Sequence, residues 1–539
     1  MAKKRVLIIG LDGATWDIYG PMMDRGHLTW LEGVRRAGCW GAMWSTAPPV
    51  TPPAWTTLMT GVNPGKHQIF GFETYDRSTG RARITTAQDN RAETMWTYLS
   101  RLGHRVVSLN LPWTYPPSPV NGVMVSGYGC PGPQFGYTHP AAFQERIERE
   151  IPGYSMVPNW EKADADDEQA FDRNLAGCRR AFDDLRRLVD LAEGEVPDWE
   201  VLLVEIQQPD LMQHHILDDL APGGGQEGPQ RAAKVLEMLD HMDGVMGAIA
   251  ARATGPEDLL IVASDHGFGE LRAKILVNNL LQQWGLLKHG PLLVHLVRRL
   301  VRNARRYWRR AGPWWSKARD LTEALLPDWS RTRAYVAMGS QYGMLYCHLR
   351  EFHSEGVMQF GEEYEALLEE LRGRLLALRD PRQGGPVFAA VERPERFYGL
   401  SVRDCPALPD LVLAAAEGYL VTRAFRGGSF LKYNRRRSTG CHRANGLWAM
   451  GGEAVKPGLQ LEAHLADIVP TVYAFLGVPL PGGLDGRVLA EAFCRPPEYS
   501  LAAAGAPARP LEAPSAQRDV NRDEQELIAR RLAELGYLE

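Results

Sequence analysis

Residues 5–12 read RVLIIGLD, an apolar run that ends in an acidic residue. A run of this kind, without polar alternation, is typical of a strand buried on both faces of a parallel sheet. The pattern recurs at Val106–Asn110, Val201–Ile206, Leu259–Ser264 and Leu411–Ala415. Helical patterns lie between these runs, for example at 169–192 and 230–251. The alternation predicts an α/β fold with a doubly wound, mostly parallel central sheet.

Aspartates follow three of these predicted strands, at the end of the sheet where ligands collect in such folds. Histidines accompany them: one lies four residues after an aspartate, which places both on one helix face, another directly follows an aspartate, and a third lies in a Gly-flanked loop. The set is Asp12, Asp210, His214, Asp265, His266 and His442. Taken singly, an aspartate after a strand is more often a helix cap, and a lone histidine is usually an ordinary core or surface side chain.

Together, three carboxylates and three imidazoles form the mixed oxygen and nitrogen set that two divalent metal ions use. We therefore expect two divalent ions, with zinc as the first choice and manganese or iron as alternatives. Thr51 is the candidate nucleophile, because a hydroxyl attacks poorly unless it is activated, and metal coordination is one way to activate it. Thr56, Thr57 and Thr60 lie nearby, and composition alone does not choose among them.

The composition excludes several classes of protein. The 539 residues are 45% hydrophobic and carry a net charge of −4, which excludes a disordered chain and a disulfide-stapled mini-domain. Without a global basic field, we expect no binding to nucleic acid as a polymer. The seven scattered cysteines, the lack of a signal-peptide core and the lack of an apolar stretch of about 18 residues favour a cytoplasmic protein with reduced thiols.

The organisation along the chain predicts a core interrupted by an insertion. We assign 1–275 and 388–490 to the catalytic core and 276–387 to an inserted helical cap, because strand signals stop there. Residues 491–539 are assigned to a linker and a C-terminal helix. The helix is indicated by Leu527, Ile528, Leu532 and Leu535, which recur at helical spacing.

Six motifs, in this order, resemble those of a known family. They are LIIGLDGATWD (7–17), TPPAWTTLMTGVNPGKHQIF (51–70), QQPDLMQHH (207–215), VASDHGFG (262–269), GCHRANG (440–446) and DIVPTVYAFLGVPLPGGLDGRVL (467–489). The chain resembles the alkaline phosphatase superfamily, in the branch of type I phosphodiesterases and nucleotide pyrophosphatases. It is most similar to prokaryotic members described as predicted phosphohydrolases or phosphomutases.

The resemblance implies a role for each matching position. One metal ion would be held by Asp12, Thr51, Asp265 and His266, and the other by Asp210, His214 and His442. Thr51 would attack phosphorus in line and form a phosphothreonine, which a metal-bound hydroxide hydrolyses. The sulfatases of the superfamily carry Cys at the nucleophile position and Arg four residues later; Thr51 and Trp55 stand there instead, which argues against sulfate esters.

One position departs from the family pattern. Nucleotide pyrophosphatases carry an Asn shortly after the His of the TG…H motif, where it contacts the phosphoryl group. After His67 this chain has Phe72 instead, which weakens a nucleotide-pyrophosphatase assignment. Asn110 and Arg443 are alternative donors to the phosphoryl oxygens.

The expected activity is hydrolysis of a phosphate ester, with a phosphodiester preferred to a monoester. The substrate would be a phosphorylated small molecule, lipid or glycan. The alternatives are a phosphomutase, a phosphoryl or head-group transferase that uses the same site, and a non-catalytic member that binds a ligand or a membrane. The sequence leaves the natural substrate and the oligomeric state open.

The segment 288–319 has a distinct charge pattern, with ten Lys or Arg and no Asp or Glu. At helical spacing its apolar and basic residues fall on opposite faces. Three interpretations remain: a cap helix with solvated arginines, peripheral contact with the inner face of a membrane, and recognition of a polyanionic substrate.

Overall fold

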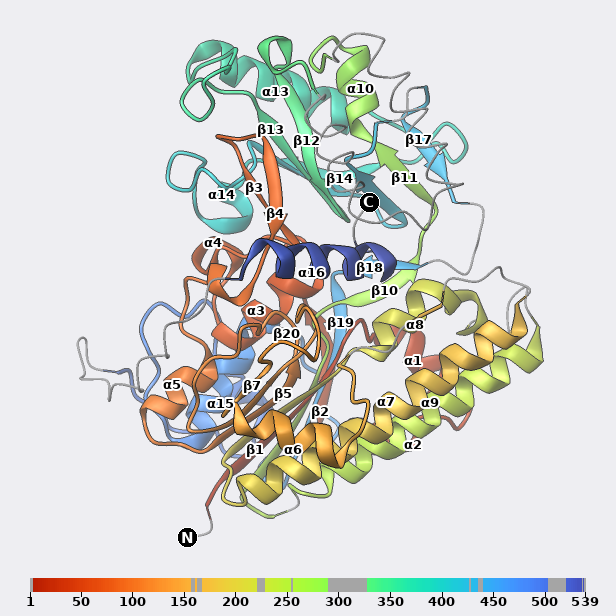
Figure 1. Ribbon diagram of the computed structural model, residues 1–539, viewed down its shortest axis with the longest axis vertical. Helices are drawn as coiled ribbons and strands as arrows, with labels where there is room; N and C mark the ends of the chain where they lie inside the picture. Colours follow the sequence, from red (N-terminus) through yellow and green to blue (C-terminus); the bar gives the residue numbers. More distant parts are fainter. Residues whose placement is uncertain are drawn as a thin grey trace. The chain divides into compact units, whose positions relative to one another are not determined.

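The strand that contains Val6–Ile9, β1 (Arg5–Leu11), lies in the middle of the central sheet of the computed structural model (Figure 1). Among the described residues this sheet has nine strands, in the order β20-β2-β19-β9-β1-β8-β5-β6-β7. The other bounds are β20 (Ala463–His464), β2 (Cys39–Trp44), β19 (Asn445–Gly451), β9 (Asp258–Ala263), β8 (Val201–Ile206), β5 (Val106–Leu111), β6 (Gly122–Ser126) and β7 (Thr138–His139). β9, β1, β8, β5 and β6 are mutually parallel, which confirms the predicted mostly parallel sheet.

The structure describes most of the chain. The ranges left out are 1–2, 157–159, 162–166, 221–227, residue 254, 289–326, 426–427, 435–439, 503–519, residue 536 and 538–539. Of the predicted basic helix at 288–319, only Lys288 is therefore described. Among the described helices, none combines the length and the apolar character that crossing a bilayer requires.

Helices cover both faces of the central sheet, as the unbroken apolar character of β1 predicts. Leu7 and Ile9 pack on the side of α2 (Thr29–Ala37), α7 (Glu168–Glu195) and α9 (Pro229–Ala250). Val6 and Ile8 pack on the side of α3 (Thr51–Thr60), α5 (Met95–Arg101) and α15 (Ile468–Leu476). Because all four strand residues are fully buried, the sheet is doubly wound as predicted.

Further helices and strands of this part of the chain are α1 (Trp16–Met23), α4 (Pro64–His67), α6 (Ala142–Glu150), α8 (Gln208–Ile216), β10 (Gly267–Glu270), β18 (Gly440–Arg443) and α16 (Arg522–Leu535). The hairpin of β3 (Glu73–Asp76) and β4 (Arg81–Ile84) extends from it. Helix α16 occupies the segment where the leucine spacing predicts a helix. Ile528, Leu532 and Leu535 are buried, whereas Leu527 is exposed.

The chain divides into two compact units, and the boundaries differ from those predicted. Unit 1 comprises 1–74, 84–271 and 434–539, and unit 2 comprises 75–83 and 272–433. Unit 2 contains the sheets β12-β13-β15-β14 and β16-β11-β17. Its elements are β11 (Ala273–Leu276), α10 (Val277–Gln283), β12 (Ala334–Gly339), β13 (Tyr342–Cys347), α13 (Glu362–Leu376), β14 (Phe388–Glu392), α14 (Glu395–Tyr398), β15 (Leu411–Ala415), β16 (Tyr419–Thr422) and β17 (Leu431–Tyr433).

Two expectations about the insertion are therefore corrected. The described part of 276–387 is not purely helical, since it holds β12 and β13. The run Leu411–Ala415, assigned to the central sheet, forms β15 and pairs antiparallel with β13 and β14. The error has a physical reason: an apolar run shows that a strand is buried but does not specify which strands pair with it.

A buried ion pair explains why residues 75–83 belong to unit 2. The Arg77 guanidinium Nη1 lies 2.9 Å from Asp410 Oδ2, and both side chains are almost wholly buried. Asp410 also accepts hydrogen bonds from the backbone N–H of Cys347 (2.6 Å) and from the Tyr364 hydroxyl (2.8 Å). The pair thus ties the hairpin between β3 and β4 to the four-stranded sheet.

We predict that Asp410→Ala destabilises unit 2 by roughly 3–5 kcal/mol, because it leaves the buried Arg77 charge without its partner. Hydrogen-exchange mass spectrometry would show faster exchange in peptides from β12, β13 and β15, with the central sheet unchanged. Glu369→Ala removes a largely exposed carboxylate from α13 and serves as the control. Unchanged exchange in Asp410→Ala would contradict the account.

Candidate metal centre

The predicted site residues of unit 1 follow the carboxyl ends of three adjacent strands. Asp12 follows β1, Asp265 follows β9, and Asp210 lies in the first turn of α8, which follows β8. The order β9-β1-β8 brings these three carboxylates to one edge of the sheet. Gly13 permits the close approach, because its φ of 72° and the 3.1 Å between an added Cβ and Asp210 Cβ both disfavour a side chain.

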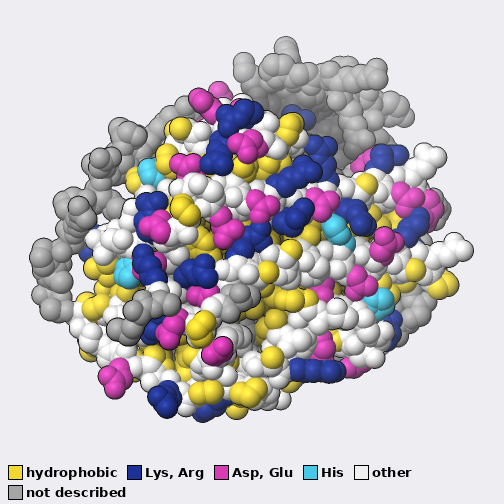
Figure 2. All heavy atoms as spheres, turned by 90° about the horizontal axis from the view of Figure 1, so that it is seen from below, with side chains coloured by type: hydrophobic (Ala, Val, Ile, Leu, Met, Phe, Trp, Pro, Cys, Tyr) yellow, Lys and Arg dark blue, Asp and Glu magenta, His cyan; other side chains and the backbone are white. Residues whose placement is uncertain are grey.

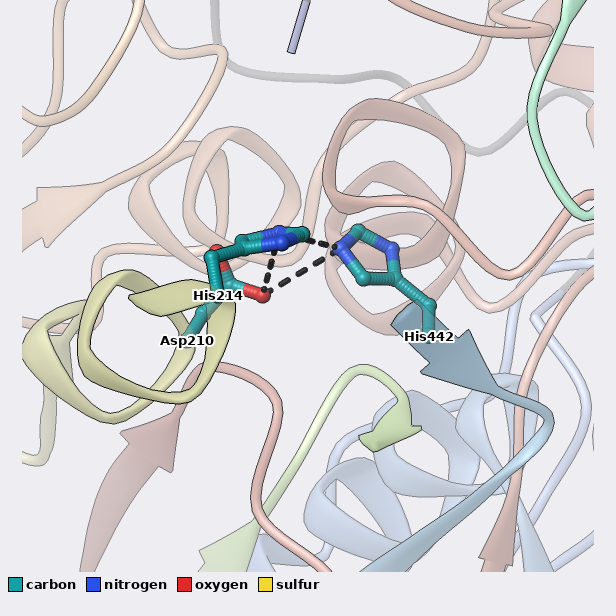
Figure 3. Close-up of side chains that lie close together, drawn as sticks. All are labelled: Asp210, His214 and His442. Carbon is teal, nitrogen blue, oxygen red and sulfur yellow. Dashed lines mark hydrogen bonds and ion pairs between the residues drawn. The ribbon is translucent and has the colours of Figure 1, made fainter. Parts of the chain in front are cut away.

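One group of ligand atoms consists of Asp210, His214 and His442 (Figure 3). Asp210 Oδ1 lies 3.5 Å from His214 Nε2 and 3.2 Å from His442 Nε2, and the two Nε2 atoms are 3.0 Å apart. His214 comes from the next turn of α8, as the spacing of four predicts. His442 comes from β18, whose antiparallel pairing with β10 sets it opposite Phe268.

A second group consists of Asp12, Asp210 and His266, so Asp210 takes part in both. His266 Nε2 lies 3.4 Å from Asp12 Oδ1 and 3.3 Å from Asp265 Oδ2. The other oxygen of Asp265 accepts a hydrogen bond from the backbone N–H of Gly13 at 3.2 Å. The His266 and His442 rings stack with their centroids 3.8 Å apart, so the two groups adjoin.

Backbone carbonyls orient two of the imidazoles. His442 Nδ1 lies 3.1 Å from Pro49 O, and His266 Nδ1 lies 3.1 Å from Gly267 O. Because a carbonyl oxygen can only accept, each Nδ1 carries a proton, so in the neutral ring the lone pair lies on Nε2. The Nε2 atoms face the carboxylates, and this tautomer is the one that metal ligation through Nε2 requires.

The electrostatics of the group are those of a buried negative site. Burial, followed by the charges of neighbouring carboxylates, raises the pKa of Asp12 well above its ordinary value. Burial also raises the pKa of Asp265. Burial alone would raise the pKa of Asp210, but His214 and His442 outweigh it and lower that pKa below its ordinary value. Burial and then the nearby His442 lower the pKa of His266, which keeps its ring neutral.

The donor set fits divalent cations. Among the described residues, four buried side-chain atoms of this set have no hydrogen-bond partner: Asp12 Oδ1, Asp210 Oδ1, Asp265 Oδ2 and His266 Nε2. The same holds for the buried Thr51 Oγ1. Burying so many polar atoms without partners is costly, and a bound cation removes that cost. Carboxylate oxygen together with neutral imidazole is a ligand set that suits zinc and related divalent ions.

Thr51 begins α3 and is fully buried. Its position at a helix N-terminus favours a bound anion through the helix dipole. The backbone adds few donors there, because Pro52 and Pro53 carry no N–H and the Ala54 N–H bonds Val50 O. Two hydrogen bonds link the neighbours of Thr51 to the Asp and His groups. Trp55, one turn further along α3, donates from Nε1 to Asp12 Oδ2 (3.2 Å), and Pro49 accepts from His442 as described above.

The two alternative phosphoryl donors have other partners in the structure. The Asn110 side-chain oxygen accepts a hydrogen bond from the Tyr154 hydroxyl. The Arg443 guanidinium donates to Glu270 O at 2.7 Å and to His442 O at 3.2 Å. Phe72, at the family's Asn position, packs its ring against Trp113, with centroids 5.2 Å apart.

Sequence reasoning missed three further residues at the site. Glu205, on β8, is buried, and burial followed by the charges of Asp265 and Asp210 raises its pKa. Tyr128 is buried with an unpartnered hydroxyl, and its pKa is raised by burial and then by Asp210 and Asp12. Tyr537 donates a hydrogen bond to Asp210 Oδ2. An acidic residue inside an apolar strand could have marked Glu205; no local pattern marks the two tyrosines.

Comparison with known families agrees with the motif resemblance. A family model described as type I phosphodiesterase / nucleotide pyrophosphatase matches residues 6–447. The matched range includes Thr51 and the aspartates and histidines of both groups. A search of curated proteins found no match.

We predict that zinc or manganese stabilises the protein against heat, by about 2.7 kcal/mol when the free ion is at a hundred times its dissociation constant. Asp265→Asn should lose this stabilisation, since it removes an anionic ligand. Asp258→Asn is the matched control: it lies at the other end of β9, is also buried, and pairs with Arg5. That variant should lower the melting temperature yet keep the metal-dependent increase. An unchanged metal-dependent increase in Asp265→Asn would contradict the assignment.

Proposed function

Because this chain belongs to the type I phosphodiesterase / nucleotide pyrophosphatase family, we propose that it is a metal-dependent hydrolase of phosphate esters, acting on a diester before a monoester. The observation that carries the proposal is the cluster of four buried ligand atoms without a hydrogen-bond partner among the described residues, together with the equally unpartnered Thr51 hydroxyl at the start of α3. A nucleophile, a cation-binding set and an anion-stabilising helix end thus share one site.

Seven residues would hold two divalent cations. One ion would be bound by Asp12, Thr51, Asp265 and His266, and the other by Asp210, His214 and His442. When bound, such ions supply positive charge that polarises the phosphoryl group and stabilises charge on the attacking and leaving oxygens. Zinc is the first choice, with manganese and iron as alternatives.

In the proposed reaction, Thr51 Oγ1 attacks phosphorus and loses its proton to solvent, while the bond from phosphorus to the leaving alkoxide breaks and that group takes up a proton. Water then attacks the phosphothreonine and gives up a proton, the bond from Thr51 Oγ1 to phosphorus breaks, Thr51 Oγ1 takes up a proton, and phosphate or a phosphomonoester leaves. The positive end of the α3 helix dipole stabilises the phosphoryl oxygens in both steps. Trp55 keeps Asp12 in place through its hydrogen bond to Oδ2.

The proposed substrates are phosphorylated small molecules, lipids or glycans rather than nucleic acid polymers, and the proposed location is the cytoplasm. The net charge of −4 supports the choice of small phosphorylated substrates over nucleic acid polymers. So does the face shown in Figure 2, where basic and acidic side chains are interspersed. Polymer binding relies instead on many lysines and arginines gathered along one surface.

The direct test is an assay of the purified protein with bis-p-nitrophenyl phosphate and p-nitrophenyl phosphate, each with zinc or manganese. We expect metal-dependent release of p-nitrophenol, faster from the diester. Transfer of the phosphoryl group to an added alcohol rather than to water would identify a transferase. Transfer of that group to another hydroxyl of a substrate that has one would identify a mutase. No turnover with any of these ions would contradict the proposal.

Thr51→Ala should lower kcat by roughly a thousandfold or more, because it removes the nucleophile. Thr51→Ser keeps a hydroxyl and should retain partial activity. Thr56→Ala, one turn along α3, removes a hydroxyl that bonds only the backbone oxygen of Pro52 among the described contacts, and it should remain active. Mass spectrometry of quenched reactions should detect phosphate on Thr51. A Thr51→Ala protein with near-normal turnover would show that water is the attacking group.

A further inference from the structure

The C-terminal segment lies beyond the matched family range, which ends at 447, yet it reaches the metal centre. Helix α16 packs into the same core cluster as α7 and α9 through Ile528, Leu532 and Leu535. Polar contacts reinforce this packing. The Tyr115 hydroxyl donates to Glu524 Oε1 at 3.1 Å, and Arg531 donates to Cys130 O at 3.4 Å.

The end of α16 directs Tyr537 toward Asp210. The backbone N–H of Tyr537 donates to Leu532 O at 2.9 Å, a bond across the helix end of the kind that reverses the chain after a helix. The Tyr537 hydroxyl then donates to Asp210 Oδ2. Its ring stands perpendicular to His214 at 5.2 Å and contacts Phe72 at 5.2 Å and Tyr128 at 5.5 Å between centroids.

The two oxygens of Asp210 have different surroundings. Oδ1 faces His214 and His442 and has no hydrogen-bond partner among the described residues, whereas Oδ2 accepts the phenol. A hydrogen bond to the second oxygen fixes the rotation of a carboxylate and leaves the first oxygen directed at the ion. The edge contact of the Tyr537 ring with His214 limits the movement of the His214 ring, which is a second ligand of the same ion.

We propose that Tyr537 is a positioning residue for Asp210 and His214, so that the C-terminal segment completes the binding site of one of the two ions. This inference rests on the proposed metal-dependent function. It assigns Tyr537 to the ion held by Asp210, His214 and His442, because its hydroxyl bonds Asp210 and its ring contacts His214. Tight binding of that one ion then depends on docking of α16.

The test measures zinc affinity of the full chain by competition with a chromophoric chelator, for wild type and Tyr537→Phe. The substitution keeps the ring and its packing and removes only the hydroxyl. We expect two bound ions in wild type, and in the variant a loss of roughly 10–100-fold in affinity for one of them, with the other unchanged. Activity of the variant should recover at saturating zinc. Tyr499→Phe, at an exposed tyrosine, is the matched control and should change neither affinity.

The remaining outcomes separate the two proposals. If wild type binds no ion, the proposed function fails. If wild type binds two ions and Tyr537→Phe binds both equally well, only the role of Tyr537 fails. A variant that binds zinc more tightly, or is more active at limiting zinc, would show that the phenol obstructs the centre and would overturn the inference.

Discussion

Three carboxylates buried at adjacent strand ends are the constraint on which the site depends. Asp12, Asp210 and Asp265 are each fully buried, and mutual repulsion in a poorly solvated site is severe. The protein meets part of this cost with imidazoles and with hydrogen bonds from Trp55, Gly13 and Tyr537. Several oxygens still have no hydrogen-bond partner among the described residues, and the proposed divalent cations would supply the missing positive charge.

The connection to unit 2 preserves this arrangement. The chain leaves unit 1 after Leu271 and returns at Asn434, so His266 and His442 are separated by an entire compact unit in sequence. The antiparallel pairing of β10 with β18 closes this gap and stacks the two rings. Because the two strands pair at the base of the insertion, the positions of His266 and His442 are set within unit 1.

Local sequence patterns predicted those site residues whose positions are set by a single strand end or helix. The strand ends preceding Asp12 and Asp265, and the spacing of Asp210 and His214 on α8, follow from periodicity alone. The place of His442 depends on a long-range strand pairing. The sequence grouped it with the others by residue type and its Gly-flanked loop, and the family resemblance then assigned it to one ion. Tyr537 could not be foreseen, because an amphipathic pattern indicates that α16 docks but not where. The same limit explains why the apolar run of β15 was assigned to the wrong sheet.

The central claim is that this Asp and His cluster holds two divalent ions. Anomalous X-ray scattering from crystals soaked in zinc tests it most directly, because it locates each ion independently of activity. We predict one peak among Asp210, His214 and His442 and a second among Asp12, Asp265 and His266, beside Thr51. A map with no peak at either position, or with zinc bound only elsewhere on the protein, would contradict the account.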